Sequence, residues 1–183
     1  MRLKESLVIS FYIIAAIWLV FLVSCISPAD LKGFGIKPRQ TSGLMGIMLF
    51  PFLHANLSHI ISNTCALMTL LPLTFMLGKG LAAEACAIIL VTSGGLVWIF
   101  GQPGTVHIGA SGMVFGLMGF LIFAGPLHGK PWLMILSIAM VFVYGGSIFI
   151  NLFNFAPGIS WAGHFFGLMS GVFAAWMTKP EAS

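Results

Sequence analysis

The few charged residues of this chain separate long apolar stretches, and this pattern constrains the fold more than any other feature. A helix needs about 20 consecutive apolar residues to cross the hydrocarbon core of a bilayer. Each charge-free stretch is long enough to hold one or two such helices. The stretches run from Glu5 to Asp30, Arg39 to Lys79, Glu84 to Lys130 and Lys130 to Lys179.

Composition agrees with a membrane location. Of 183 residues, 59% are hydrophobic and only 7% are charged, whereas a soluble domain carries about 25% charged residues. This much apolar surface cannot be buried in one small core, so lipid must cover part of it. The net charge of +4 comes without any basic run or patch, so we expect no nucleic-acid partner.

The apolar pattern predicts an all-α polytopic membrane protein with six transmembrane helices. Because the loops between them are short, residues 1–183 are predicted to form a single domain. The predicted spans are approximately residues 7–27, 58–77, 81–100, 111–125, 132–150 and 161–177.

Lys and Arg residues predict the orientation, because they are enriched in cytoplasmic loops. With cytoplasmic N- and C-termini, five basic residues are inside and three are outside. The inner set is Arg2, Lys4, Lys79, Lys130 and Lys179, and the outer set is Lys32, Lys37 and Arg39.

The first apolar segment has two interpretations. Arg2 and Lys4 precede an apolar run that ends in a lipoprotein-like box at residues 22–25, which is also typical of a cleaved signal peptide. The run is longer than the usual 7–15-residue core of a signal peptide. An uncleaved first span is therefore favoured over cleavage.

Two segments are expected to be irregular. Residues 43–54 contain Pro51 and are too short to cross, which indicates an interfacial or re-entrant segment. Residues 101–110 are rich in glycine and cannot form a regular helix in lipid.

The fourth span, at about 15 residues, rises only about 22 Å. Its first residue, Ser111, is therefore expected below the outer surface, in a water-filled pocket open to the outside.

Four polar side chains are predicted to lie at one depth. His59, Asn63, Ser111 and His164 occur at the outer ends of the second, fourth and sixth spans, which all run outside to inside. Polar residues inside a membrane usually face the bundle interior and mark function.

Two glycine stripes indicate which spans touch. Glycines about four residues apart let helix backbones approach closely. Pairing the stripes would bring Ser111 near His164, although ordinary helix packing would also use them. The stripes are Gly112, Gly116 and Gly119 in the fourth span and Gly163, Gly167 and Gly171 in the sixth.

A serine beside a histidine suggests a nucleophile and its general base. The four acidic residues all fall in loops or ends, so a Ser–His dyad is expected rather than a triad. Phe115, one turn after Ser111, could stack on the imidazole. His59 and Asn63 are four residues apart on one helix face and could bind an oxyanion together with the Ser111 N–H. Alternatively, they only join helices.

The remaining histidines have other expected roles. His54 is expected to tie the 43–54 segment to the second span. His107 lies in the outer loop near the pocket, and His128 is expected to be solvated in an inner loop. The sequence lacks a His-Glu-x-x-His motif, so a zinc protease is not expected, and its single aspartate, Asp30, excludes a two-aspartate intramembrane protease. No cofactor or metal is expected. The three scattered cysteines suggest small apolar filler.

Three motifs resemble those of the rhomboid intramembrane serine proteases. They are His54-x₄-His59-x₃-Asn63, Gly109-Ala110-Ser111-Gly112 and His164-x₂-Gly167-x₃-Gly171, and the resemblance covers roughly residues 30–178.

The resemblance implies a function for these residues. Ser111 would be the nucleophile and His164 the general base, with His59, Asn63 and the Ser111 N–H as the oxyanion hole. The substrates would be single-span membrane proteins, cleaved at the periplasmic side of a bacterial inner membrane without metal or cofactor. Supporting positions would be Gly109, Phe115, His54, Gly163 and Gly167.

This chain departs from the family pattern at three places. Met45-Gly46 stands where the family's first loop commonly has Trp-Arg, Phe115 where a tyrosine is frequent, and Gly163 where alanine is frequent.

Two alternatives to a protease function remain. A non-catalytic rhomboid-like protein that binds transmembrane substrates would usually lack the serine or histidine, and a proton-coupled transporter would need a carboxylate in the bundle.

Overall fold

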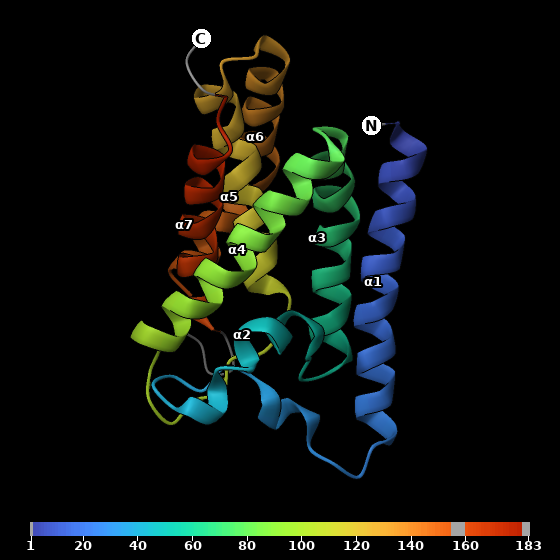
Figure 1. Cartoon of the computed structure of the whole chain (residues 1–183), viewed down its shortest axis with the longest axis vertical. Helices are drawn as coiled ribbons and strands as arrows, with labels where there is room; N and C mark the ends of the chain where they lie inside the picture. The colour runs from blue at the N-terminus through green and yellow to red at the C-terminus, as the bar shows by residue number, and fades with distance from the viewer. Residues whose placement is uncertain (1, 155–159, 181–183) are drawn as a thin grey trace.

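The computed structural model describes residues 2–154 and 160–180, and these form a helical bundle (Figure 1). Short 3₁₀ turns at Leu31–Phe34, Thr41–Gly43 and Phe50–Phe52 shape the segment between the first two long helices. The helices are α1 (Leu3–Ile26), α2 (Gly46–Leu49), α3 (Leu57–Met76), α4 (Lys79–Phe100), α5 (Ser111–His128), α6 (Pro131–Leu152) and α7 (Trp161–Met177).

Five helices, α1, α3, α4, α5 and α6, are long and apolar enough to cross a membrane. The predicted all-α, multi-pass membrane architecture is therefore confirmed. The sixth predicted span corresponds to α7, which has the predicted bounds but only 17 residues. It packs against α5 and α4 inside the bundle.

Helix α5 extends beyond the predicted end of the fourth span. We expected it to end at Gly125, before Pro126, but α5 continues to His128. Proline removes one helical N–H and disturbs the hydrogen bonding around it. The Ser137 hydroxyl of α6 compensates, because it accepts from the Gly125 N–H at 3.0 Å and donates to the Leu121 carbonyl at 2.8 Å. With 18 residues α5 is about 27 Å long. Its length is therefore closer to the thickness of the hydrocarbon core, about 30 Å, than the predicted length of about 22 Å is. The other predicted ends differ by up to four residues.

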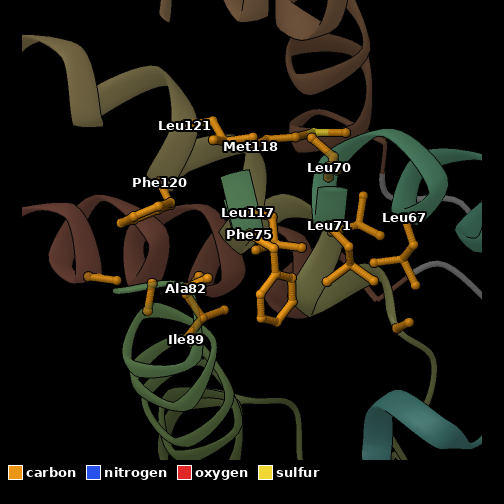
Figure 2. Packing of buried hydrophobic residues seen from close by; sticks show 14 of the residues in the cluster. Leu67, Leu70, Leu71, Phe75, Ala82, Ile89, Leu117, Met118, Phe120 and Leu121 are labelled. Carbon is orange, nitrogen blue, oxygen red and sulfur yellow. The ribbon is translucent and has the colours of Figure 1, made fainter. Parts of the chain in front are cut away.

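The core forms where α3, α4 and α5 meet. Figure 2 shows Leu70, Leu71 and Phe75 of α3 close to Leu117 and Met118 of α5. Eleven residues of α5 are buried, and the helix contacts α3, α4, α6 and α7. The helix that begins at Ser111 is therefore the central element of the bundle.

The two glycine stripes face each other along α5 and α7. A Cβ added to Gly167 would lie 3.1 Å from the Gly112 Cα, and one added to Gly171 would lie 2.7 Å from the Phe120 nitrogen. Only glycine allows this approach of two helix backbones. The contact fixes the register of α7 on α5.

The helices α3, α5 and α7 run in the same direction (Figure 1). They begin at the end of the bundle where the irregular 27–56 segment lies, and the start of α1 and the end of α7 lie at the opposite end. The polar residues near the starts of α3, α5 and α7 consequently gather at one end.

Candidate active site

A cavity of about 1410 Å³ opens where α3, α5, α6 and α7 meet. All four polar residues singled out above line it: His59, Asn63, Ser111 and His164. Helix α6 contributes Tyr144, Ser147 and Asn151 to its lining. The cavity is thus larger than the roughly 300–1,000 Å³ of a typical small-molecule site, and several polar groups line it.

Ser111 is the first residue of α5, and the loop before it is held from two sides. The Gly109 N–H donates to the Phe50 carbonyl at 2.8 Å, and the Ala110 N–H donates to His54 Nε2 at 3.4 Å. Gly109 has φ +109°, and an added Cβ would overlap the His59 ring. Glycine is therefore required by both the backbone conformation and the space.

His54 joins this loop to α3. Its Nε2 accepts from Asn63 Nδ2 at 3.1 Å as well as from Ala110, while Nδ1 lies 3.4 Å from the Phe52 carbonyl. Two donors at Nε2 require the neutral tautomer with the proton on Nδ1. Burial, and next the charge of His59, lower the pKa of His54 to about 4. His54 therefore stays neutral at physiological pH and orients the Asn63 amide.

His59 and Asn63 lie one turn apart near the start of α3. Asn63 is buried and His59 is half-buried. The Asn56 side chain caps the helix by accepting from the His59 N–H at 2.9 Å, and the His54 and His59 rings meet edge-on at 5.0 Å between centroids. The amide of Asn63 and the ring of His59 are thus both fixed by neighbours.

His164 lies in the first turn of α7 and is buried, 7% exposed. The Phe115 ring stacks on its imidazole, with centroids 4.4 Å apart and planes 15° apart. The Nδ1 atom is buried and has no hydrogen-bond partner among the described residues. Within the same residues, no hydrogen bond joins Ser111 and His164, and such bonds often tighten only when substrate binds.

Among the described residues, the lining of the cavity contains no carboxylate. The group that stacks on the His164 imidazole is the Phe115 ring. Among residues 2–154 and 160–180, no group of three or more His, Cys, Asp or Glu side chains could hold a metal ion. The described site offers a hydroxyl, imidazoles and an amide as its chemical groups.

A second hydrogen-bonded cluster was not anticipated from the sequence. His107 Nδ1 lies 2.7 Å from the Ser160 hydroxyl, which also caps α7 by accepting from the Gly163 N–H at 3.0 Å. A serine just before a predicted helix is an N-cap signature, so the cap itself was detectable. The pairing with His107, 53 positions earlier, was not.

The expectation that His128 is solvated was wrong. It is the last residue of α5, half-buried, with Nε2 3.1 Å from the Ala175 carbonyl of α7. The three extra residues of α5 beyond Gly125 carry it back against α7.

Comparison with known proteins shows the family of this chain. Residues 41–181 match the Rhomboid domain. The chain belongs to the rhomboid family. The expected resemblance is thereby confirmed, and the fold is that of a rhomboid membrane bundle.

Similar proteins include longer relatives, of which the matches cover 59% to 73%. "Uncharacterized protein Rv1337" of Mycobacterium tuberculosis is 36% identical over 176 residues, covering 92% of this chain and 73% of the relative. "Uncharacterized protein ML1171" of Mycobacterium leprae is 33% identical over 175 residues, covering 91% and 69%. "Putative rhomboid protease YdcA" of Bacillus subtilis is 30% identical over 133 residues, covering 65% and 59%. Rhomboid proteins form a family of intramembrane proteases, and this chain is one of its members.

Proposed function

We propose that this rhomboid protein is an intramembrane serine endopeptidase that cleaves transmembrane segments of single-span membrane proteins. Ser111 is the nucleophile and His164 the general base of a Ser–His dyad. The observation that carries the proposal is the shared cavity, in which Ser111, His164, His59 and Asn63 all face one space between helices.

The proposed reaction begins when the Ser111 hydroxyl attacks the scissile carbonyl while His164 accepts its proton. The oxyanion formed is stabilised by the Asn63 amide, the His59 ring and the Ser111 backbone N–H. His164 then protonates the leaving amine, and an acyl-enzyme on Ser111 remains. A water molecule, deprotonated by His164, hydrolyses this ester and restores the free serine.

The absence of an acidic partner is compatible with this mechanism. In a triad, the acid holds the imidazole in the correct orientation and tautomer. Here the Phe115 ring supports the flat face of the imidazole, and the glycine contact between α5 and α7 fixes the distance between the two helices. Orientation by packing thus takes the place of orientation by charge.

We further propose that the protein lies in a bacterial inner membrane with cytoplasmic termini and an active site open to the periplasm. The excess of Lys and Arg at the end of the bundle that carries the termini supports this orientation. The polar cavity lies at the other end, where periplasmic water would supply the hydrolytic step.

The test uses purified protein in detergent with a fluorescent single-span substrate. The wild type is expected to cleave it, and Ser111→Ala and His164→Ala are each expected to abolish cleavage with unchanged helicity. Their effects should not add, because the two residues act as one unit. A mechanism-based isocoumarin should label Ser111. Substrate binding without cleavage by the wild type would instead favour a non-catalytic rhomboid-like role.

A further inference from the structure

His107 and Ser160 form a hydrogen bond that joins the two halves of the proposed dyad. His107 lies four residues before Ser111, and Ser160 lies four residues before His164. Their bond, 2.7 Å from His107 Nδ1 to Ser160 Oγ, therefore connects the nucleophile loop directly to the start of the helix that carries the base.

With a neutral His107 ring, the surrounding bonds assign one direction to each proton in this cluster. The Thr105 hydroxyl donates to the Gln102 carbonyl at 2.6 Å, so its oxygen accepts from His107 Nε2–H at 2.9 Å. Nδ1 of the neutral ring is then an acceptor, and it receives the Ser160 hydroxyl proton. The Ser160 oxygen in turn accepts the Gly163 N–H at 3.0 Å. Every hydrogen bond in this series then joins one donor to one acceptor.

Both ends of the bond are themselves anchored. The His107 backbone pairs with Ile36 through two bonds of 2.9 Å, N–H to carbonyl in each direction. Ser160 holds the first turn of α7 through its side chain and through its carbonyl, which accepts the His164 N–H at 3.1 Å. A movement of Ser160 would thus be transmitted to His164 through its own backbone bond.

The pair also lies close to the nucleophile. His107, Ser160 and Ser111 line the large cavity and, together with Gly163, a small cavity of about 10 Å³. The pair therefore lies at the edge of the site, where its hydrogen bond joins the two elements that carry Ser111 and His164.

We propose that the His107–Ser160 hydrogen bond is a positioning device that holds His164 in register with Ser111. The inference rests on the proposed protease function. It assigns to two uncharged side chains the alignment that an acidic residue provides in a triad. His107 acts as the acceptor and Ser160 as the donor. Neither residue takes part in bond making or breaking.

The test compares kcat and KM for cleavage of the fluorescent substrate. His107→Leu and Ser160→Ala are expected to lower kcat by up to about 10²-fold, because small displacements of reacting groups have effects of this size, while KM changes little. The double variant should lose clearly less than the two single effects added together, since both changes remove the same His107–Ser160 bond. Ser160→Thr, which keeps the hydroxyl, and His107→Asn, which keeps an acceptor near Nδ1, should restore most of kcat.

A matched control removes a hydroxyl that joins helices far from the site. Ser137 bridges α5 and α6 near Gly125, so Ser137→Ala should lower the melting temperature without lowering kcat. The two variants are compared at an equal loss of melting temperature. If Ser160→Ala then loses no more kcat than Ser137→Ala does, the result would overturn the positioning role. Additive losses in the double variant would do the same.

A second readout is independent of activity. Nitrogen-15 NMR of histidine-labelled protein should show His107 protonated at Nε2 and unprotonated at Nδ1. Its Nδ1 signal should shift in Ser160→Ala and return in Ser160→Thr. A proton on Nδ1, or no shift in Ser160→Ala, would refute the bond even if His107→Leu fails to fold. If the wild type and Ser111→Ala are equally inactive while the NMR result holds, the protease proposal fails and the bond remains.

Discussion

Ser111 combines a nucleophilic hydroxyl with the start of a helix. The first N–H groups of a helix have no partner inside it, and the helix dipole places partial positive charge there. A carbonyl attacked by Ser111 would develop negative charge beside these groups. The side chains of His59 and Asn63, which line the same cavity, would add to an anion site that the backbone already favours.

This predicts graded effects at the oxyanion hole. His59→Ala and Asn63→Ala should each lower kcat without abolishing cleavage, because the Ser111 N–H remains. Loss of one such donor typically costs about 10²–10³ in rate, or about 2.7–4 kcal/mol. The double variant should lose more than either single variant. Turnover and thermal unfolding are measured on the same preparations; normal turnover in the double variant would show that the two residues only join helices.

His54 predicts a pH dependence of stability. Its pKa in the folded protein is about 4, below the value of about 6.5 for a free histidine. The unfolded chain thus binds a proton more readily between these values, so the free energy of unfolding falls as pH drops from about 6.5 to about 4 and is flat outside this window as far as His54 is concerned.

The measurement is the melting temperature in detergent from pH 7.5 to pH 4. His54→Asn removes the titrating group while keeping a polar side chain, so its melting temperature should fall less steeply with acid than that of the wild type. Parallel curves for the two proteins would contradict a buried neutral His54.

Among the helices, the contact between α5 and α7 determines whether the site can assemble. The backbones approach through glycines. At Gly167 and Gly171 the groups that an added Cβ would meet are backbone atoms of α5, which cannot move aside as a flexible side chain can. The distance between the Ser111 and His164 helices is therefore set by residues one to two turns away from the chemistry.

Gly171→Ala is accordingly expected to lower the free energy of unfolding by about 1–3 kcal/mol or more, as overpacking does, and to reduce kcat by separating the helices. Gly95→Ala is the matched control, because a Cβ there meets nothing within 4 Å. It should leave stability unchanged or raise it by up to about 1 kcal/mol. The free energy of unfolding of both variants is measured by thermal unfolding in the same detergent. Equal values would show that α7 can shift on α5 without loss of stability.

At the scale of the whole molecule, the bundle separates its polar cavity from its chain ends. The start of α1 and the end of α7 lie at one end of the bundle, and the cavity lies at the other (Figure 1). A single orientation in the membrane thus decides which compartment supplies water to the site.

With the orientation proposed here, Ser111→Cys in intact bacterial cells should react with a membrane-impermeant thiol reagent. Cys25, Cys65 and Cys86 are replaced first, so that Ser111→Cys carries the only thiol. Labelling is measured by a mass shift in gel electrophoresis. Reaction only in inverted membrane vesicles would reverse the orientation.

The sequence by itself determined the membrane class, the approximate positions of the long helices and the family. These follow from local properties: apolar length, glycine spacing and short motifs such as Gly109–Gly112. Lipid makes such properties decisive, because every backbone polar group in the hydrocarbon core needs an internal partner and only a helix provides one locally.

Tertiary structure alone decided the features that depend on a second helix. The end of α5 at His128 required Ser137 of α6, which satisfies the groups around Pro126. The neutral tautomer of His54 required Asn63 and Ala110 as donors. The link from His107 to Ser160 joins residues 53 positions apart. In each case the partner of a polar group comes from a distant segment, and no local pattern specifies which one the packing will bring within hydrogen-bonding distance.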